Sequence, residues 1–213
     1  MARTSHSRRR GWTSLWLVVW LPVLLALFCG LIVVANLWLA RVELENALEA
    51  AALASVKEWG DAGGGDTLSA RQVGAEFAAA NSVRGQPLEL ATNYAGQLAS
   101  RSGLVRVRLV SAQPPTDCNQ NLTCDPGSGH LIFGAIDDTD PNHVVFNVGL
   151  CPSCGEAKFG VRAQAMVEVP MLNCVFLGNL GPSQIQAKAT AQYDCQTRRV
   201  RLVRIDEFIC PGQ

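Results

Sequence analysis

Apolar residues dominate the start of the chain without interruption. No charged residue occurs from Gly11 to Ala40, and Leu, Val and Trp fill many of these positions. A bilayer core needs about 20 apolar residues in a helix, whereas the apolar part of a cleaved signal peptide has only about 7–15. The pattern therefore predicts a retained transmembrane helix over residues 12–40, and a cleaved signal is the alternative interpretation.

The helical pattern continues beyond the apolar run. Residues 41–59 contain no Gly or Pro and are rich in Ala, Leu and Glu, which favour helices. Their apolar positions recur every three or four residues and form one stripe. The stripe consists of Leu44, Leu48, Ala51, Ser55 and Trp59. We expect a helical stalk over 41–59, ended by Gly60 and the glycines at 63–65, with this stripe available to a protein partner.

Residues 60–213 have the pattern of a separate α+β domain. Ser69 and Gln72 have the spacing of a capping box, which predicts a helix from Ser69 with Val73 and Phe77 on one face. The hydrophobic period then changes to two, which is typical of strands. The predicted strands are 104–110, 131–133, 144–146, 161–169, 185–193 and 199–205. Strands that follow two helices indicate a largely antiparallel sheet.

The distribution of charge gives the chain a direction in the membrane. Residues 1–41 carry five Arg and no acid, a net charge of +5, whereas residues 42–213 carry 13 basic and 18 acidic residues, a net charge of −5. Positive flanks stay in the cytoplasm. We therefore expect a basic cytoplasmic tail (1–11), a single crossing of the membrane, and an extracytoplasmic domain. Nucleic acid is excluded as a partner of such a domain, despite its basic cluster at Arg198–Arg204.

Small residues within the apolar run indicate a packing surface. Ala26 and Gly30 are four residues apart, a spacing that lets a second helix approach closely. Together with Leu44, Leu48 and Trp59 they are the candidates for helix packing, and a homo-oligomer through this helix is one such arrangement. A helix that faces only lipid is the alternative.

Eight cysteines are many for a domain of this size. Cys29 lies in the apolar run, and the other seven are candidates for disulfides in an oxidising compartment. These seven are Cys118, Cys124, Cys151, Cys154, Cys174, Cys195 and Cys210. The pairs at 118/124 and 151/154 are close enough to bridge locally, but spacing alone does not assign partners. Two functional alternatives exist: a zinc site formed by four cysteines from two pairs, and a redox-active dithiol at 151/154. Structural disulfides are favoured over both.

No catalytic signature accompanies these features. The sequence lacks the motifs of serine hydrolases, zinc proteases, phosphate-binding loops and dinucleotide-binding folds. His130 and His143 have no recognisable nucleophile nearby in sequence. The acidic run Asp137–Asp140 offers oxygen ligands that would suit Ca²⁺, but acidic residues also initiate turns, and the turn is favoured. We therefore expect a protein that is not an enzyme and has no cofactor and no metal.

Several segments resemble the TadE/TadG-like family of Flp (Tad) pilus-assembly proteins. The specific part comprises the basic leader Arg8–Gly11, the Leu-Pro motif at 21–22, and the run Trp38–Ala47 with its Ala-rich continuation to Ser55. Residues 129–138, 161–169 and 185–191 are similar to the family's exported β region more loosely. The resemblance implies a bacterial inner-membrane protein that contributes to pilus assembly or secretion, with the lipid bilayer and other pilus-assembly or envelope proteins as partners.

Two other functions are compatible with the sequence. An anchored envelope enzyme could use Cys151 and Cys154 for thiol–disulfide exchange. A cleaved and secreted binding module is the third interpretation, and it requires the apolar run to be removed.

Overall fold

The computed structural model describes residues 10–64, 67–90, 106–107, 130–140, 143–148, 150, 152–155, 157–170 and 181–209. The leader at 8–9, most of the predicted strand 104–110, and five of the candidate cysteines lie outside these residues. Those five are Cys118, Cys124, Cys151, Cys174 and Cys210.

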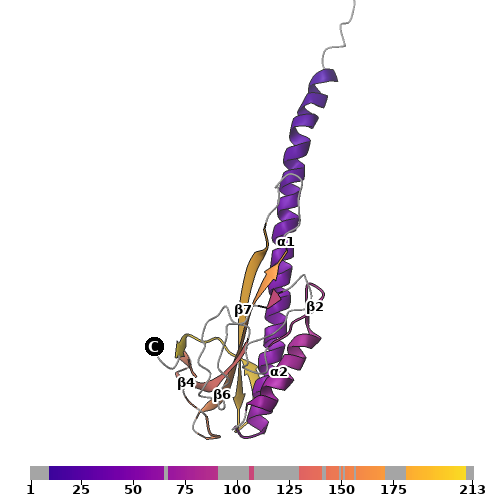
Figure 1. Cartoon of the computed structure of the whole chain (residues 1–213). Helices are drawn as coiled ribbons and strands as arrows, with labels where there is room; N and C mark the ends of the chain where they lie inside the picture. Colours follow the sequence, from indigo (N-terminus) through magenta and orange to yellow (C-terminus); the bar gives the residue numbers. More distant parts are fainter. Residues whose placement is uncertain are drawn as a thin grey trace, which may run out of the picture.

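One long helix organises the molecule. Helix α1 (Arg10–Asp61) has 52 residues and is therefore about 78 Å long. Its first half projects beyond the domain, and its second half lies within it (Figure 1). The helix ends where the sequence predicts, because Gly63 and Gly64 adopt φ of +73° and +92°. Their N–H groups bond to the carbonyls of Gly60 and Trp59, which closes the last turn.

Helix α2 (Leu68–Ala80) differs from its prediction in two respects. Thr67, not Ser69, occupies the N-cap position, and the hydroxyl of Ser69 donates a hydrogen bond to Glu58 instead. The buried face is also different, since Phe77 is 51% exposed whereas Ala70, Gly74 and Ala78 are buried. Small residues face α1 because the two helices approach closely: a Cβ on Gly74 would overlap Ser55.

The strands form one large sheet and a small hairpin. The hairpin pairs β1 (Ser82–Val83) with β2 (Gln86–Pro87). The order in the large sheet is β8-β7-β6-β4-β5-β9, and β3 pairs with the end of β6. The bounds are β3 (Arg106–Val107), β4 (His130–Asp140), β5 (His143–Asn147), β6 (Lys158–Val169), β7 (Ser183–Asp194), β8 (Arg199–Leu202) and β9 (Glu207–Ile209).

The sheet is mixed, which corrects the expectation of a largely antiparallel sheet. β5 and β9 pair in parallel, whereas the other described strand pairs are antiparallel. The predicted strand 199–205 ends at Leu202, and the chain then crosses from one edge of the sheet to the other. We call residues 203–206 the crossing segment. Because β9 does not pair with the strand that precedes it through a hairpin, its direction need not be antiparallel, and it pairs with β5 in parallel.

The short crossing segment requires a curved sheet. Five steps from Leu202 to Glu207 reach at most about 17 Å, whereas six strands in a flat sheet span about 24 Å. Hydrogen bonds fix both ends of the segment: the Val203 N–H donates to the Thr190 carbonyl, and the Asp206 N–H donates to the Val144 carbonyl. The concave face holds a small apolar cluster, in which Phe146 and Phe208 stack with their ring centroids 5.2 Å apart.

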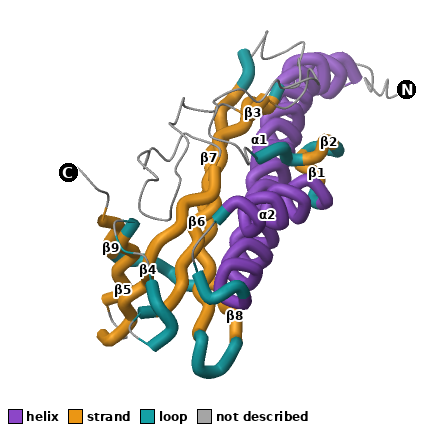
Figure 2. Tube along the Cα trace, turned by 60° about the horizontal axis from the view of Figure 1, so that its bottom comes forward, coloured by secondary structure: helices purple, strands orange, loops and turns teal. Residues whose placement is uncertain are grey.

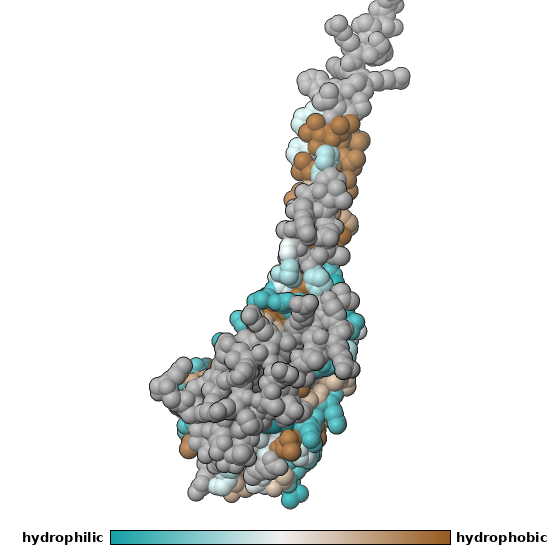
Figure 3. Space-filling model, viewed as in Figure 1, coloured by the Kyte–Doolittle hydropathy of each residue, from teal (hydrophilic) through white to brown (hydrophobic). Residues whose placement is uncertain are grey.

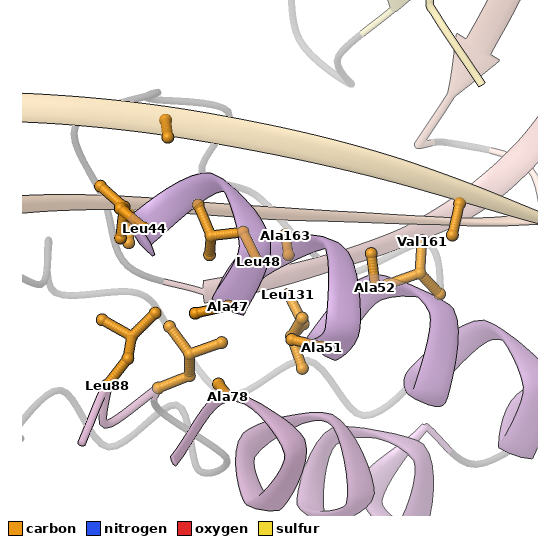
Figure 4. Packing of buried hydrophobic residues seen from close by; sticks show 14 of the residues in the cluster. Leu44, Ala47, Leu48, Ala51, Ala52, Ala78, Leu88, Leu131, Val161 and Ala163 are labelled. Carbon is orange, nitrogen blue, oxygen red and sulfur yellow. The ribbon is translucent and has the colours of Figure 1, made fainter. Parts of the chain in front are cut away.

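The main core lies on the other face of the sheet. Helices α1 and α2 cover that face together (Figure 2). Side chains from β6 and β7 point at α1 from alternate positions, among them Val161, Ala163 and Ala191. Leu44, Leu48 and Ala51 of α1 fill the layer between the helix and the strands (Figure 4). The segment 41–59 is thus helical, as expected, but it is the central helix of the domain and does not form a free stalk.

Candidate functional site

The first half of α1 exposes an apolar surface on several sides. Most of its large side chains are exposed from Trp16 to Leu39, and brown residues gather on this part of the molecule in Figure 3. The most exposed members include Val18, Leu31, Val34 and Trp38. Among the described residues, α1 is long and apolar enough to cross a membrane. A surface of this extent marks contact with lipid or with another apolar partner.

A polar contact fixes where this surface meets the domain. The β1–β2 hairpin turns at Arg84 and Gly85, both with positive φ, as a two-residue hairpin requires. The Arg84 backbone N–H donates to Glu43 Oε2 at 2.6 Å, and its Nη1 donates to Asn36 Oδ1 at 2.7 Å. We call these contacts the Arg84 clamp. It ties the hairpin to α1 at the level of Asn36, which therefore lies beside charged groups.

Ala26 and Gly30 lie on the apolar half of α1. Both side-chain positions are half-buried, on the same helix face as the buried Val33 and Ala40. A Cβ built on Gly30 would meet nothing within 4 Å. The backbone at Gly30 is therefore open to close approach by another helix, which is the geometry that small residues permit in membranes.

Leu44, Leu48 and Trp59 contact the chain itself. All three are at most 1% exposed. Trp59 packs edge-on against Phe133 and Phe159, with centroid separations of 5.1 and 4.8 Å. The protein partner of this part of the stripe is thus the chain's own sheet, whereas Ala26 and Gly30 lie in the apolar half of α1.

The described cysteine bridge joins distant parts of the sequence. Cys154 bonds to Cys195 at the end of β7, across a sequence separation of 41 residues. Its partner is therefore not the neighbouring Cys151, which removes the dithiol on which a thiol–disulfide site at 151/154 depends. Cys29 is also disulfide-bonded. Its place in the apolar run gave no indication of this.

Asp137 and Asp138 of the acidic run accept hydrogen bonds from neighbouring parts of the fold. Asp137 accepts hydrogen bonds from the N–H and hydroxyl of Thr139 at an irregularity in the pairing of β4 with β5. The run Asp137–Asp140 is thus the end of strand β4 and not the turn that the sequence favoured. Asp138 accepts hydrogen bonds from Lys158, Gln192 and Arg201. Burial opposes ionisation of Asp138, but these donors outweigh burial and hold its pKa below the ordinary value. No group of three His, Cys, Asp or Glu within the described ranges is arranged to hold a metal ion.

His143 and Arg71 occupy different electrostatic environments. His143 Nε2 lies 3.0 Å from Glu207 Oε2 on the exposed edge formed by β5 and β9. Arg71 of α2 is completely buried, donates to the Thr67 hydroxyl and to the Leu131 carbonyl, and lies over the Phe133 ring. It thereby joins α2 to β4. Sequence reasoning did not find Arg71, because an Arg in a short amphipathic helix normally points to solvent.

Comparison with known proteins identifies the N-terminal part of the chain. Residues 11–58 match the family model for Flp pilus-assembly TadE/G-like proteins. Neither curated proteins nor solved structures gave a significant match. The matched segment coincides with α1 almost from end to end, so it includes both the exposed apolar half and the core-forming half. The resemblance seen in the sequence is confirmed over residues 11–58, where this chain is similar to TadE/TadG-like proteins.

Proposed function

We propose that the chain is a membrane-anchored, non-enzymatic component of Flp/Tad-type pilus assembly or secretion. One observation carries the proposal: the helix that matches the TadE/G-like family is apolar and exposed in its first half and is the core of an α+β domain in its second half. A single rigid element thus connects a surface suited to lipid with a domain suited to protein contacts.

The Arg84 clamp suggests where the membrane ends on α1. A guanidinium group is costly in hydrocarbon, so the lipid-embedded part ends before Asn36. Residues 12–35 would then span about 36 Å, enough to cross a core of about 30 Å with some tilt. Trp38, which is 68% exposed, would lie at the outer headgroups, where indole rings are enriched.

The orientation rests on the charge distribution, and the location in the inner membrane rests on the similarity to TadE/G-like proteins. The basic leader would remain in the cytoplasm, and the domain would lie outside, where its disulfides are stable. The domain contributes contacts with pilus or envelope partners, and Ala26 and Gly30 contribute contacts with a second helix in the membrane. That second helix is either another assembly protein or another copy of this chain.

Protease accessibility tests the arrangement. Spheroplasts of cells that express the chain with an N-terminal and a C-terminal epitope tag are treated with external protease. We expect loss of the C-terminal tag and protection of a short N-terminal fragment in the membrane fraction. Protection of the C-terminal tag in intact spheroplasts, with loss after lysis, would contradict the orientation.

The role in assembly requires a functional test. A strain without the gene should lose surface pili, measured in the sheared fraction, and the intact gene should restore them. A variant in which residues 16–34 other than Cys29 become Leu keeps the anchor and the disulfide-bonded cysteine but loses Ala26 and Gly30. If the helix contacts a partner, this variant inserts normally but restores few pili. Normal piliation of the gene-deleted strain would refute the assembly role itself.

A further inference from the structure

An open pocket lies on the concave face of the sheet, beneath the crossing segment. Its volume is about 600 Å³, which lies in the range of sites for small organic ligands. Its lining comes from β6, β7, β8, the crossing segment and β9, with one residue from α1. Most of its lining, including Arg162, lies on the opposite face of the sheet from the main core, and Glu49 reaches it from α1.

The feature that distinguishes this pocket is a buried cation. Arg162 of β6 is 7% exposed and lines the pocket. Within the described part of the chain it forms no ion pair, and its buried Nε has no hydrogen-bond partner. Its described interaction is with the ring of Phe208, whose centroid lies 4.2 Å from the guanidinium carbon. Burial lowers the pKa of Arg162 from its ordinary value, but the group stays protonated.

A buried charge without an acidic partner is unfavourable for folding. The cation–π contact with Phe208 compensates in part and keeps the guanidinium beside this ring. A guanidinium group presents its N–H donors in a planar fork, which matches the two oxygens of a carboxylate. The geometry is therefore that of a binding group that lacks its anion.

Neighbouring residues extend the donor set. Thr190 lies directly opposite Arg162 in the pairing of β6 with β7, and Lys188 is two positions away on the same face. Arg204 of the crossing segment also lines the pocket, and both Lys188 and Arg204 are exposed. Two flexible cations thus stand at the rim, and one fixed cation lies deeper.

The acidic residues of the pocket limit the charge of the ligand. Glu49 and Asp206 also line it, and Asp206 Oδ2 accepts the Val144 N–H. Three cations and two acids give a net charge of +1, which suits a monoanion better than a dianionic phosphate. Leu202, Val203 and Ile205 add apolar surface beside the charged groups.

We propose that this pocket binds the carboxylate of a small ligand that also has an apolar part, with Arg162 as the main anion-binding group. The site is independent of the proposed role in pilus assembly. Sequence alternation places Arg162 on the face away from α1, where it would be expected in solvent. The crossing segment and Phe208 bury it there.

Ligand-observed NMR with the full chain in an uncharged detergent tests the proposal. The probes are benzoate, benzamide and inorganic phosphate. We expect saturable binding of benzoate, at least tenfold weaker binding of benzamide, and weaker binding of phosphate than of benzoate. Absence of saturable benzoate binding, or equal binding of benzamide, would overturn the proposal. Tighter binding of phosphate would overturn the assignment to a carboxylate.

Variants assign the effect to the pocket. Arg162→Gln should weaken benzoate binding at least tenfold, and Arg162→Lys should weaken it less. Arg199→Gln is the matched control, because Arg199 is exposed on β8 and does not line the pocket; it should change affinity less than twofold. If Arg162→Gln fails to fold by circular dichroism, the double variant Lys188→Gln/Arg204→Gln decides, with an expected loss of about tenfold. Unchanged affinity in the folded variants refutes the site.

Discussion

At the scale of single residues, a substitution of Leu48 tests how much the packing of α1 on the sheet contributes to the stability of the domain. The side chain is completely buried between α1 and the sheet. Leu48→Ala should destabilise the full chain by about 2–5 kcal/mol, because buried apolar contacts are lost and a cavity remains. Urea unfolding in detergent, followed by tryptophan fluorescence, measures the change.

A neighbouring position provides the control for Leu48. Asn46 is exposed on the same helix, so Asn46→Ala should alter the unfolding free energy by no more than about 0.5 kcal/mol. Equal stability of the Leu48 and Asn46 variants would mean that α1 does not pack on the sheet as described.

Asp138 gives the domain a defined dependence on pH. Its carboxylate is 15% exposed and accepts hydrogen bonds from Lys158, Gln192 and Arg201. Its pKa is lower in the folded state than the ordinary 3.8. The stabilisation is therefore fully present above about pH 5 and is lost as the pH falls through the folded pKa.

Replacing this carboxylate should remove that dependence. Asp138→Asn should cost about 1–2 kcal/mol at pH 7, since Lys158 and Arg201 lose a charged acceptor. The difference between the variant and the parent should shrink as the pH falls below about 4. Unfolding measured from pH 3 to pH 7 tests this, and a difference that stays constant over the whole range would contradict the assignment.

At the scale of elements, substitutions at two glycines distinguish packing within the chain from packing between chains. A Cβ on Gly74 would lie 1.8 Å from the Ser55 hydroxyl, at the crossing of α1 and α2, whereas one on Gly30 would meet nothing within 4 Å. Gly74→Ala should therefore destabilise the domain by about 1–3 kcal/mol through overpacking. Gly30→Ala should leave its unfolding unchanged, and thermal unfolding of both variants in one detergent checks the contrast.

Gly30 has a second, larger variant that tests contact with a partner. Gly30→Leu should also leave the domain intact, but it should reduce recovery of the membrane partner in co-purification if that partner packs closely here. Unchanged recovery with Gly30→Leu would assign this face of α1 to lipid.

Elements that local chemistry decides were predictable from the sequence, and those that depend on tertiary geometry were not. The end of α1 follows from Gly63 and Gly64, and the strands β6 and β7 follow from alternation. The buried face of α2 could not be predicted, because closeness to α1 selects Gly74 and Ala78 over the larger Phe77. The parallel strand β9 depends on sheet curvature, which no local pattern encodes.

The candidate site divides in the same way. The apolar half of α1 is apparent from the sequence, because a membrane span needs only length and composition, while Ala26 and Gly30 stay predictions of a packing surface. The intramolecular burial of Leu48 is not, since an amphipathic stripe looks the same whether it faces its own sheet or another protein. Arg162 is likewise hidden, because its burial comes from residues more than 40 positions later.

At the scale of the whole molecule, continuity of α1 should fix the rotation of the domain relative to the membrane. The helix has no break between its exposed apolar half and its core half, and the Arg84 clamp holds the hairpin against it near Asn36. The domain therefore has no flexible tether at this point. Partners that contact both the membrane half and the domain would be sensitive to the helical phase between them.

Insertions in α1 test this coupling directly. Two Ala residues inserted after Leu31 should rotate the domain by about 200° relative to the membrane half and raise it by about 3 Å, whereas four Ala residues rotate it by only about 40° and raise it by about 6 Å. We expect the two-residue insertion to abolish piliation of the complemented strain and the four-residue insertion to retain more of it, with equal membrane levels of both. If the four-residue variant performs no better than the two-residue variant, then distance and not rotation limits function. If both support normal piliation, the domain works without a fixed orientation, because a helix that transmits rotation cannot tolerate a half-turn change of phase.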